Sequence, residues 1–271
     1  MSPDRSLPDR PTHVNLRLEG KLAVITGGSK GIGLACARAF LDEGARVALL
    51  SRDPANLASA RASLGRDVFT RAVDLADAAA AKLAFAEVSA AQGPIDVLIN
   101  SAGAARRHPP LELDAAAWRQ AIDAKFFPAI NAMDAVLPAM AARGTGAVVN
   151  IIGVGGKVAD PFHIAGGAAN AALMLATKGL AVAYAPRGVR INGINPGMTR
   201  TGRVKDRLEV EARTSGGSPE DLLRKAESRI PAGRMATPEE VAQVALFLAS
   251  EQASYIFGAV LPMDGATHPV I

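Results

Sequence analysis

Short apolar runs alternate with longer amphipathic segments along most of the chain. Each apolar run ends in glycine or polar residues, which is typical of buried parallel strands that lead through a turn into a helix. The pattern predicts strands at 21–26, 45–50, 67–73, 95–99, 147–152, 189–195 and 260–261, and helices at 31–43, 77–91, 114–140 and 163–184, with others starting near 53 and 237. The expected fold is a single-domain α/β Rossmann fold, a doubly wound parallel sheet of about seven strands with helices on both faces.

The ends of the chain and its composition set the domain plan. Residues 1–17 carry three prolines among Arg and Asp, without the apolar run of a signal peptide or membrane helix, and are expected to be a flexible tail. Residues 18–271 form the expected single domain, in which the polar segment 199–234 is the expected substrate lid. The single cysteine, Cys36, is expected to be a buried apolar residue, which fits a reducing cytoplasm.

The net charge of +4 raises the question of an anionic partner. Lys and Arg are scattered along the chain, so nucleic acid and membrane surfaces are not expected as partners. Anionic small molecules fit better as partners, and the sequence points to no metal site.

In the lid, the basic residues are Arg200, Arg203, Lys205, Arg207 and Arg213. Acidic neighbours offset them (Glu209, Glu211, Glu220 and Asp221), which favours a salt-bridged amphipathic lid over a carboxylate or acyl-CoA site.

The first expected strand runs into the glycine-rich turn Thr26-Gly27-Gly28-Ser29-Lys30-Gly31-Ile32-Gly33. Absent side chains there let the backbone turn tightly and approach a pyrophosphate at the helix N-terminus. With Asn100-Ser101-Ala102-Gly103, Asn195-Pro196-Gly197-Met198-Thr199 and Pro262-Met263-Asp264-Gly265-Ala266, this opening resembles the short-chain dehydrogenase/reductase family. The resemblance covers residues 18–265, with the motifs in the family's order.

The resemblance implies a dinucleotide site. Its expected residues are Gly27, Ser29, Lys30, Gly31, Ile32, Gly33, Ser51, Arg52, Asp74, Leu75, Asn100, Ala102, Gly103, Pro196, Gly197, Thr199 and Thr201. The second strand ends in Ser51-Arg52 rather than in an acidic residue, and a guanidinium pairs with a 2′-phosphate, so NADP is favoured over NAD. The alternatives stay open that Arg52 is a solvated surface charge, that Asp74 only ends its strand and that Thr201 caps a lid helix.

The family's catalytic positions read differently here. Carbonyl-reducing members use a serine after the fifth strand, a Tyr-x-x-x-Lys pair on the following helix and an asparagine on the helix before. The alignment places Gly153, Gly166, Asn170 and Lys125 at the serine, tyrosine, lysine and asparagine positions respectively. The only tyrosines, Tyr184 and Tyr255, have no lysine four residues on, so no shift of the alignment restores the motif.

Lysine and asparagine look exchanged between the two helices. We expect Lys125 to restore the ammonium group near the ribose and Asn170 to hydrogen-bond the ribose or water, against the alternative of two unrelated drifts in a disused site. His163, three residues before Gly166, is the expected proton donor, with Lys125, Lys157 and Asp160 as further candidates. The glycine pair at 166–167 predicts space beside the nicotinamide, unless the helix begins later, near Ala168.

Three function classes remain open. The first is an NADP(H)-dependent oxidoreductase acting on a carbonyl or alcohol of a small molecule, with a non-standard proton donor. The second is non-redox chemistry on the same scaffold by a dehydratase, isomerase or cyclase. The third is a catalytically inactive NADP-binding partner or sensor. By the resemblance, the alanine-rich helices at 114–140 and 163–184 imply a homotetramer or dimer.

Overall fold

The protein was analysed as a computed structural model, which describes residues 15–103, 105–202, 204, 208, 212 and 218–268. The strands are β1 (Leu22–Thr26), β2 (Arg46–Ser51), β3 (Phe69–Ala72), β4 (Val97–Asn100), β5 (Gly146–Ile151), β6 (Val189–Pro196) and β7 (Val260–Met263). The helices are α1 (Gly31–Asp42), α2 (Pro54–Leu64), α3 (Ala78–Gln92), α4 (Ala115–Lys125), α5 (Phe127–Arg143), α6 (Ile164–Tyr184), α8 (Pro219–Glu227) and α9 (Pro238–Ala249). Short 3-10 turns are η1 (Pro110–Glu112), η2 (Val154–Gly156), η3 (Ala185–Arg187) and η4 (Glu251–Ala253).

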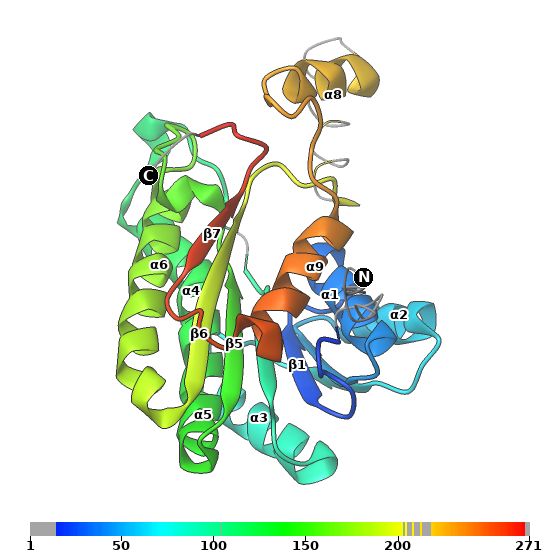
Figure 1. Cartoon of the computed structure of the whole chain (residues 1–271). Coiled ribbons are helices and arrows are strands. Elements are labelled where there is room, and N and C mark those ends of the chain that lie inside the picture. The colour runs from blue at the N-terminus through cyan, green and yellow to red at the C-terminus, as the bar shows by residue number, and fades with distance from the viewer. Residues whose placement is uncertain are drawn as a thin grey trace, which may run out of the picture.

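The seven strands form one parallel sheet in the order β3-β2-β1-β4-β5-β6-β7. Helices α1, α2 and α9 cover one face, and α3, α5 and α6 cover the other (Figure 1). Side chains of a strand alternate between the two layers: Ala23 and Ile25 pack on one face, Leu22 and Val24 on the other. The predicted doubly wound α/β fold is therefore confirmed. Its strand order reverses between β1 and β4, where such sheets bind ligands at their carboxyl edge.

Helix starts follow local capping chemistry. Asp53 and Asp77 each accept two backbone N–H groups at the starts of α2 and α3. Thr237 and Glu240 form a reciprocal capping box at the start of α9, as the Thr-Pro-Glu-Glu sequence predicts. Each such cap contributes about 1 kcal/mol, so these boundaries are encoded locally.

The expected single helix at 114–140 is wrong in one respect, because it is divided into α4 and α5 at Phe126. Pro128 has no N–H to donate to the carbonyl of Ala124, so the helical ladder is interrupted there. That carbonyl instead lies close to Gly103, where an added Cβ would stand 2.6 Å from its oxygen. The division sets the end of α4, and with it Lys125, against the loop that follows β4.

The residues at the two edges of the expected domain are partly described. Of the expected tail, residues 1–14 lie outside the described part of the chain, whereas Arg17 pairs with Glu251 at 2.9 Å and Leu18 is buried.

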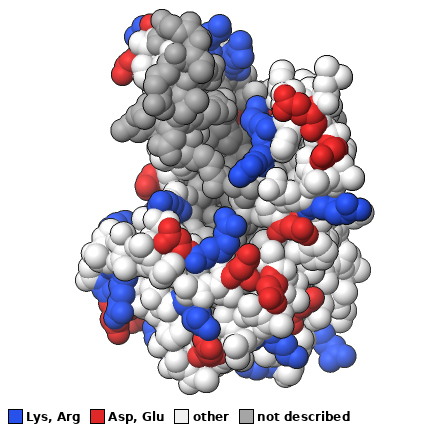
Figure 2. Space-filling view, turned by 180° about the vertical axis from the view of Figure 1, so that it is seen from behind, with Lys and Arg blue, Asp and Glu red and all other residues white. Residues whose placement is uncertain are grey.

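Cys36 is buried as expected, and its burial raises the thiol pKa to about 12. Positive and negative side chains are interspersed over the face shown in Figure 2, without a stripe of one sign.

One helical segment, Ile164–Arg187, is long and apolar enough to cross a membrane by length and composition. It consists of α6 with η3, and in this fold α6 packs against β6 and η2. Of its most apolar 18-residue window, 33% is buried inside the described structure, so packing on the sheet accounts for only part of its apolar character.

Candidate active site

The N-terminus of α1 is built to receive an anion. Its N-cap, Lys30, is extended and makes no side-chain cap hydrogen bond, and the first turn contains no acidic residue. Among the described residues, the side chain of Thr201 is the one near Gly31, where an added Cβ would meet it at 3.5 Å. Uncapped N–H groups at a helix N-terminus bind phosphates, so this end of α1 fits the pyrophosphate of a dinucleotide.

Close backbone contact shapes the same turn. A Cβ at Gly33 would overlap the carbonyl oxygen of Gly27, and one at Gly27 would stand 2.8 Å from the amide nitrogen of Ala102. Neither contact involves a side chain that could move aside. The glycines therefore let the turn after β1 lie directly against the start of α1 and the loop after β4.

The end of β2 carries hydroxyl and basic groups. The hydroxyls of Ser29 and Ser51 lie 3.0 Å apart, and Lys30 and Arg52 are exposed beside them. The neighbouring carboxylate, Asp53, accepts hydrogen bonds from two backbone amides and from the Asn56 side chain. Three of the hydrogen bonds that the Asp53 carboxylate can accept are therefore used in capping α2.

The ends of β3 and β4 are tied to the rest of the sheet. Asp74 is exposed and accepts the Ala76 amide in a turn at 3.1 Å, while Leu75 is buried. Asn100 donates to Asn150 at 2.9 Å, and Asn150 donates to Thr177 at 2.9 Å. Sequence reasoning identified Asn100 but missed Asn150 and Thr177, which become neighbours only through strand register and the packing of α6.

At the end of β6, the segment Pro196–Thr201 runs between α9 and the segment after β7. A Cβ at Gly197 would stand 2.9 Å from Asp264, and Thr199 pairs with Ala236 in an isolated bridge. Just before it, the buried Asn195 donates to the Ile152 carbonyl at 2.7 Å. The loop expected to hold the nicotinamide is thus anchored on both sides.

Lys125 and Asn170 meet across the gap between α4 and α6. The Lys125 Nζ donates to Asn170 Oδ1 at 2.8 Å, and Asn170 is 3% exposed. A Cβ at Gly153 would stand 3.1 Å from Asn170 Nδ2 and 3.9 Å from Lys125 Nζ. The two residues that look exchanged in the sequence are therefore direct partners, and both lie beside the position aligned with the family's serine.

His163 occupies the space beside Gly166. A Cβ at Gly166 would overlap the imidazole of His163, and one at Gly155 would stand 3.4 Å from its Cδ2. Because α6 begins at Ile164, both Gly166 and Gly167 are helical, and the alternative that the helix begins near Ala168 is wrong. The absence of a side chain at Gly166 is what lets the imidazole lie there.

The surroundings of His163 disfavour its charged form. Burial, then the charges of Lys125 and Arg107, lower the pKa of His163 from its ordinary value of 6.5, and Asp160 opposes them in part. Its Nδ1 is buried without a hydrogen-bond partner among the described residues. A neutral imidazole beside an ammonium group can take up a proton from a hydroxyl group.

The two weaker candidates lie in the loop before α6. Asp160 pairs with Arg107 at 2.7 Å, and Lys157 is exposed. Burial works against ionisation of Asp160, but the Phe162 amide and the Arg107 guanidinium outweigh it and lower the pKa of the carboxyl. Asp160 is thus an ionised partner of Arg107, a residue that sequence reasoning did not single out.

The lid is described in part. Arg200 pairs with Glu227 at 2.6 Å and Arg234 with Glu240 at 2.6 Å, while α8 projects away from the sheet (Figure 1). The other basic lid residues, Arg203, Lys205, Arg207 and Arg213, lie outside the described residues, as do Glu209 and Glu211. Ion pairing of the described lid agrees with the salt-bridged interpretation.

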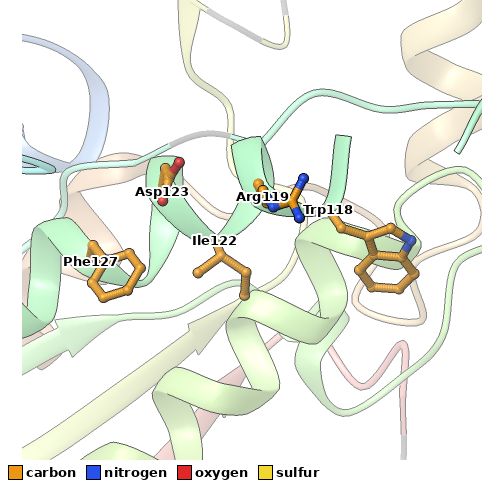
Figure 3. Close-up of a pocket in the computed structure, with 5 residues that line it drawn as sticks. All are labelled: Trp118, Arg119, Ile122, Asp123 and Phe127. Carbon is orange, nitrogen blue, oxygen red and sulfur yellow. The ribbon is translucent and has the colours of Figure 1, made fainter. Parts of the chain in front are cut away.

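A separate open pocket of about 290 Å³ lies on the outer side of α4 and α5. It is lined by Trp118, Arg119, Ile122, Asp123 and Phe127, and Trp118 and Ile122 project to the same side (Figure 3). Its lining does not include Lys125, His163 or Asn170. This pocket is a feature of the helical surface rather than of the candidate active site.

Comparison with known proteins agrees with the geometry. A family model described as enoyl-(acyl carrier protein) reductase matches residues 27–268. Galactitol 2-dehydrogenase (L-tagatose-forming) of Cereibacter sphaeroides is 40% identical over 92% of this chain and 95% of its own. D-threitol dehydrogenase of Mycolicibacterium smegmatis is 37% identical over 93% of this chain and 94% of its own. The chain belongs to the short-chain dehydrogenase/reductase family.

Solved structures show the same relationship. L-sorbose reductase from Gluconobacter frateurii, complexed with NADPH and L-sorbose, superposes with a TM-score of 0.91 at 30% identity, covering 95% of this chain and 100% of that one. An NADPH-bound short chain oxidoreductase from Pseudomonas aeruginosa PAO1, described as containing an atypical catalytic center, superposes with a TM-score of 0.84 at 31% identity, covering 93% and 98%.

Proposed function

We propose that the protein is an NADP(H)-dependent oxidoreductase that interconverts a secondary alcohol and a ketone of the polyol and ketose type, with His163 as the group that exchanges the substrate proton. The observation that carries this proposal is the placement of the His163 imidazole in the space beside Gly166, next to the Lys125–Asn170 pair. Relatives named for galactitol, D-threitol and L-sorbose support the substrate class.

The preference for NADP rests on the end of β2. Arg52 and Lys30 are exposed there beside the Ser29 and Ser51 hydroxyls, and Asp53 is occupied as a helix cap. Basic and hydroxyl groups bind a 2′-phosphate, which an available carboxylate would repel. The NADPH-bound relatives support the same choice.

The residues that would hold NADP(H) are those of the sequence prediction. In this proposal the N-terminus of α1 would hold the pyrophosphate, the loop from Asn100 through Ala102 and Gly103 would line the adenosine and phosphate path, and the 196–201 segment would hold the carboxamide. The Asn100 side chain is itself buried and bonded to Asn150, so it would support this loop from behind. When bound, the cofactor supplies or accepts the hydride. The residues of this chain do the rest of the chemistry.

In alcohol oxidation, neutral His163 takes the hydroxyl proton, and the nearby ammonium of Lys125 stabilises the negative charge that develops on the oxygen. In ketone reduction, protonated His163 donates the proton. Asn170 holds the Lys125 ammonium through its Oδ1 and so fixes its direction. Gly153 has no hydroxyl group to offer, so among the described residues Lys125, His163 and Asn170 are the polar groups that we propose act beside the substrate.

The direct test measures NADP reduction at 340 nm with galactitol and D-threitol, and NADPH oxidation with L-tagatose and L-sorbose. His163→Gln is expected to lower kcat by about 100-fold or more, the usual contribution of a general acid–base. His108→Gln is the matched control, since His108 contributes only its backbone amide to a described hydrogen bond. Full activity of His163→Gln would remove His163 from the mechanism.

The same assays separate the remaining function classes. Product formation from a substrate without absorbance change at 340 nm would indicate a dehydratase, isomerase or cyclase. Tight NADPH binding without turnover of any of the four sugars and polyols would favour a binding partner or sensor. We infer the oxidoreductase because the anion-binding end of α1 and the Lys125–His163 cluster lie at the same edge of the sheet.

We also infer a homo-oligomer built on the outer faces of α4, α5 and α6. Trp118 is 38% exposed, Phe127 41% and Leu175 73%, which leaves large apolar side chains in solvent on these helices. Burying such surfaces between copies is favourable by about 25 cal/mol per Å². Light scattering after gel filtration tests this inference, and a monomeric mass at micromolar concentration would contradict it.

A further inference from the structure

Two loops at the carboxyl edge of the sheet touch at two points. Arg107, after β4, pairs through Nη2 with Asp160 Oδ2 at 2.7 Å, and the His108 amide donates to the Phe162 carbonyl at 3.1 Å. Arg107 and Asp160 are 53 residues apart in the chain. We call the two contacts the clasp. It joins the loop that follows the cofactor-binding strand β4 to the loop that leads into α6.

The clasp ends on the turn that carries His163. Asp160 Oδ1 accepts the Phe162 amide at 2.9 Å, and the Asp160 carbonyl accepts the His163 amide at 2.8 Å. The His163 carbonyl then accepts the Gly167 amide at 2.7 Å. The backbone of His163 is therefore bound on both sides, through Asp160 and through the first turn of α6.

The ring of His163 lacks a comparable anchor. Its Nδ1 is buried without a partner among the described residues, and packing between Gly155 and Gly166 surrounds it. Glycines offer little resistance to a ring that tilts. The direction of the imidazole therefore depends on the backbone turn from which it projects, and that turn depends on Asp160.

We propose that Arg107 and Asp160 are positioning residues that hold the His163 imidazole over Gly166 for proton exchange with the substrate. This inference rests on the proposed function, in which His163 is the proton-exchanging group. Neither residue touches the reacting atoms. Their contribution is to keep the imidazole in register with the Lys125–Asn170 pair, and small displacements of such a group reduce rates strongly.

The ion pair is expected to contribute little to the stability of the fold. The side chains of Arg107 and Asp160 are 53% and 37% exposed, and exposed ion pairs contribute about 0–1 kcal/mol to stability. Loss of either charge is therefore expected to leave the fold intact. If removing the charge of Arg107 or of Asp160 lowers kcat strongly but leaves the melting temperature unchanged, the cause is a displaced His163 and not a loss of stability.

The charges that face His163 also change its pKa in a way that can be measured. They are Lys125 from α4, Arg107 from the loop after β4, and Asp160 from the loop before α6. Arg107 lowers the pKa of His163 and Asp160 raises it, so removing them has opposite effects. The pair of opposite shifts shows that both charges face His163, and the change in kcat reports whether they also hold its imidazole in position.

The experiment uses the full-length protein with NADP(H) and the polyol assay. Asp160→Asn removes the charge while its amide oxygen can still accept the Phe162 amide. Arg107→Gln removes the guanidinium, and Arg106→Gln is the matched control from the exposed neighbouring arginine. The protonation of His163 is followed by NMR titration of ¹⁵N-labelled histidine, with the His163→Gln spectrum assigning the signal among four histidines.

We expect kcat to fall about tenfold in Arg107→Gln and Asp160→Asn, with the NADPH Kd unchanged. The His163 pKa is expected to rise in Arg107→Gln, to fall in Asp160→Asn and to stay constant in Arg106→Gln. Arg107→Lys, which retains the charge, is expected to recover part of kcat.

Unchanged kcat in both variants would overturn the inference even if the His163 pKa shifts. A weaker binding of NADPH that accounts for the whole loss of activity would also overturn it. Failure of the proposed function looks different. If His163→Gln keeps full activity, His163 is not catalytic, yet the titration still reports whether Arg107 and Asp160 set its environment. Should Arg107→Gln not fold, Asp160→Asn and Arg107→Lys decide the question.

Discussion

Glycine serves opposite purposes at the turn before α1, the proposed cofactor site, and at the start of α6, the proposed catalytic site. At Gly33, a side chain would overlap the backbone oxygen of Gly27, so glycine allows one stretch of backbone to lie against another. At Gly166, a side chain would overlap the imidazole of His163, so glycine leaves room for another residue's functional group. The first use allows close packing of the backbone, and the second makes room for the side chain that we propose exchanges the substrate proton.

The difference predicts how an alanine substitution at Gly33 and one at Gly166 should change stability, cofactor binding and catalysis. Backbone atoms at the α1 turn cannot move without moving the strand and the helix to which they belong. The imidazole of His163 is the end of a side chain and can rotate away. A methyl group at Gly33 should therefore disturb folding and binding together, whereas one at Gly166 should disturb catalysis alone.

The largest expected effect comes from Gly166→Ala. The new methyl group displaces the imidazole, so kcat should fall about 100-fold, within the range of a lost general acid–base. The melting temperature should change little, because the displaced group is flexible. Stopped-flow and steady-state assays of polyol oxidation, with thermal melts of the same samples, measure both quantities.

Gly179→Ala is the control on the same helix. No described atom lies within 4 Å of a Cβ at Gly179, so the substitution should stabilise α6 by up to about 1 kcal/mol and leave kcat unchanged. If Gly166→Ala behaves like Gly179→Ala, the imidazole does not act from the space beside Gly166, and the contrast between Gly33 and Gly166 fails.

Gly33→Ala should weaken NADPH binding about 30-fold. Overpacking against fixed atoms costs about 1–3 kcal/mol, and each 1.4 kcal/mol corresponds to about tenfold in affinity or stability. Fluorescence titration with NADPH and urea unfolding should therefore both change. Unaltered affinity together with unaltered stability would show that the turn is less tightly packed than the close contact with Gly27 indicates.

Arg52→Gln should raise the Kd for NADPH about tenfold, since a charge-assisted contact to the 2′-phosphate contributes about 1.5–3 kcal/mol and this one is exposed. The Kd for NADH should stay the same. Arg61→Gln is the control, since Arg61 lies on α2 and forms only an exposed ion pair with Asp67 among the described residues. An equal loss for NADH and NADPH would argue against the choice of NADP.

The smallest effect is a shift in pH dependence. Because burial, Lys125 and Arg107 lower the pKa of His163 below 6.5, the imidazole is neutral at pH 7. Polyol oxidation, which needs the neutral base, should be lost as pH falls through that pKa, and ketone reduction should rise over the same range. Lys125→Met removes a positive charge, so the limb should move to higher pH. If the pH dependence of polyol oxidation stays the same in Lys125→Met, the charge of Lys125 does not act on the titrating group.

Much of the fold was predictable from the chain because its determinants are local. The strand pattern, the Asp53 and Thr237 caps and the glycine-rich turn depend on nearby residues, and the predicted elements agree with the structure to within a few residues. The division of the helix at Phe126 was missed although Pro128 signals it. The polar chain from Asn100 through Asn150 to Thr177 could not be predicted, since it requires the register of two strands and the position of α6.

By itself, the sequence determined the alternation of strands and helices and the glycine-rich turn between β1 and α1, because these depend on residues close together in the chain. That glycine and exchanged residues stand at the family's catalytic positions stays a prediction of the sequence. Only the tertiary structure decided that Lys125 and Asn170 are partners, that His163 lies over Gly166, and that Arg107 reaches Asp160. For the pairs Lys125–Asn170 and Arg107–Asp160, the reason is distance along the chain. Side chains 45 and 53 residues apart meet only after the parallel strands bring their carboxyl edges together.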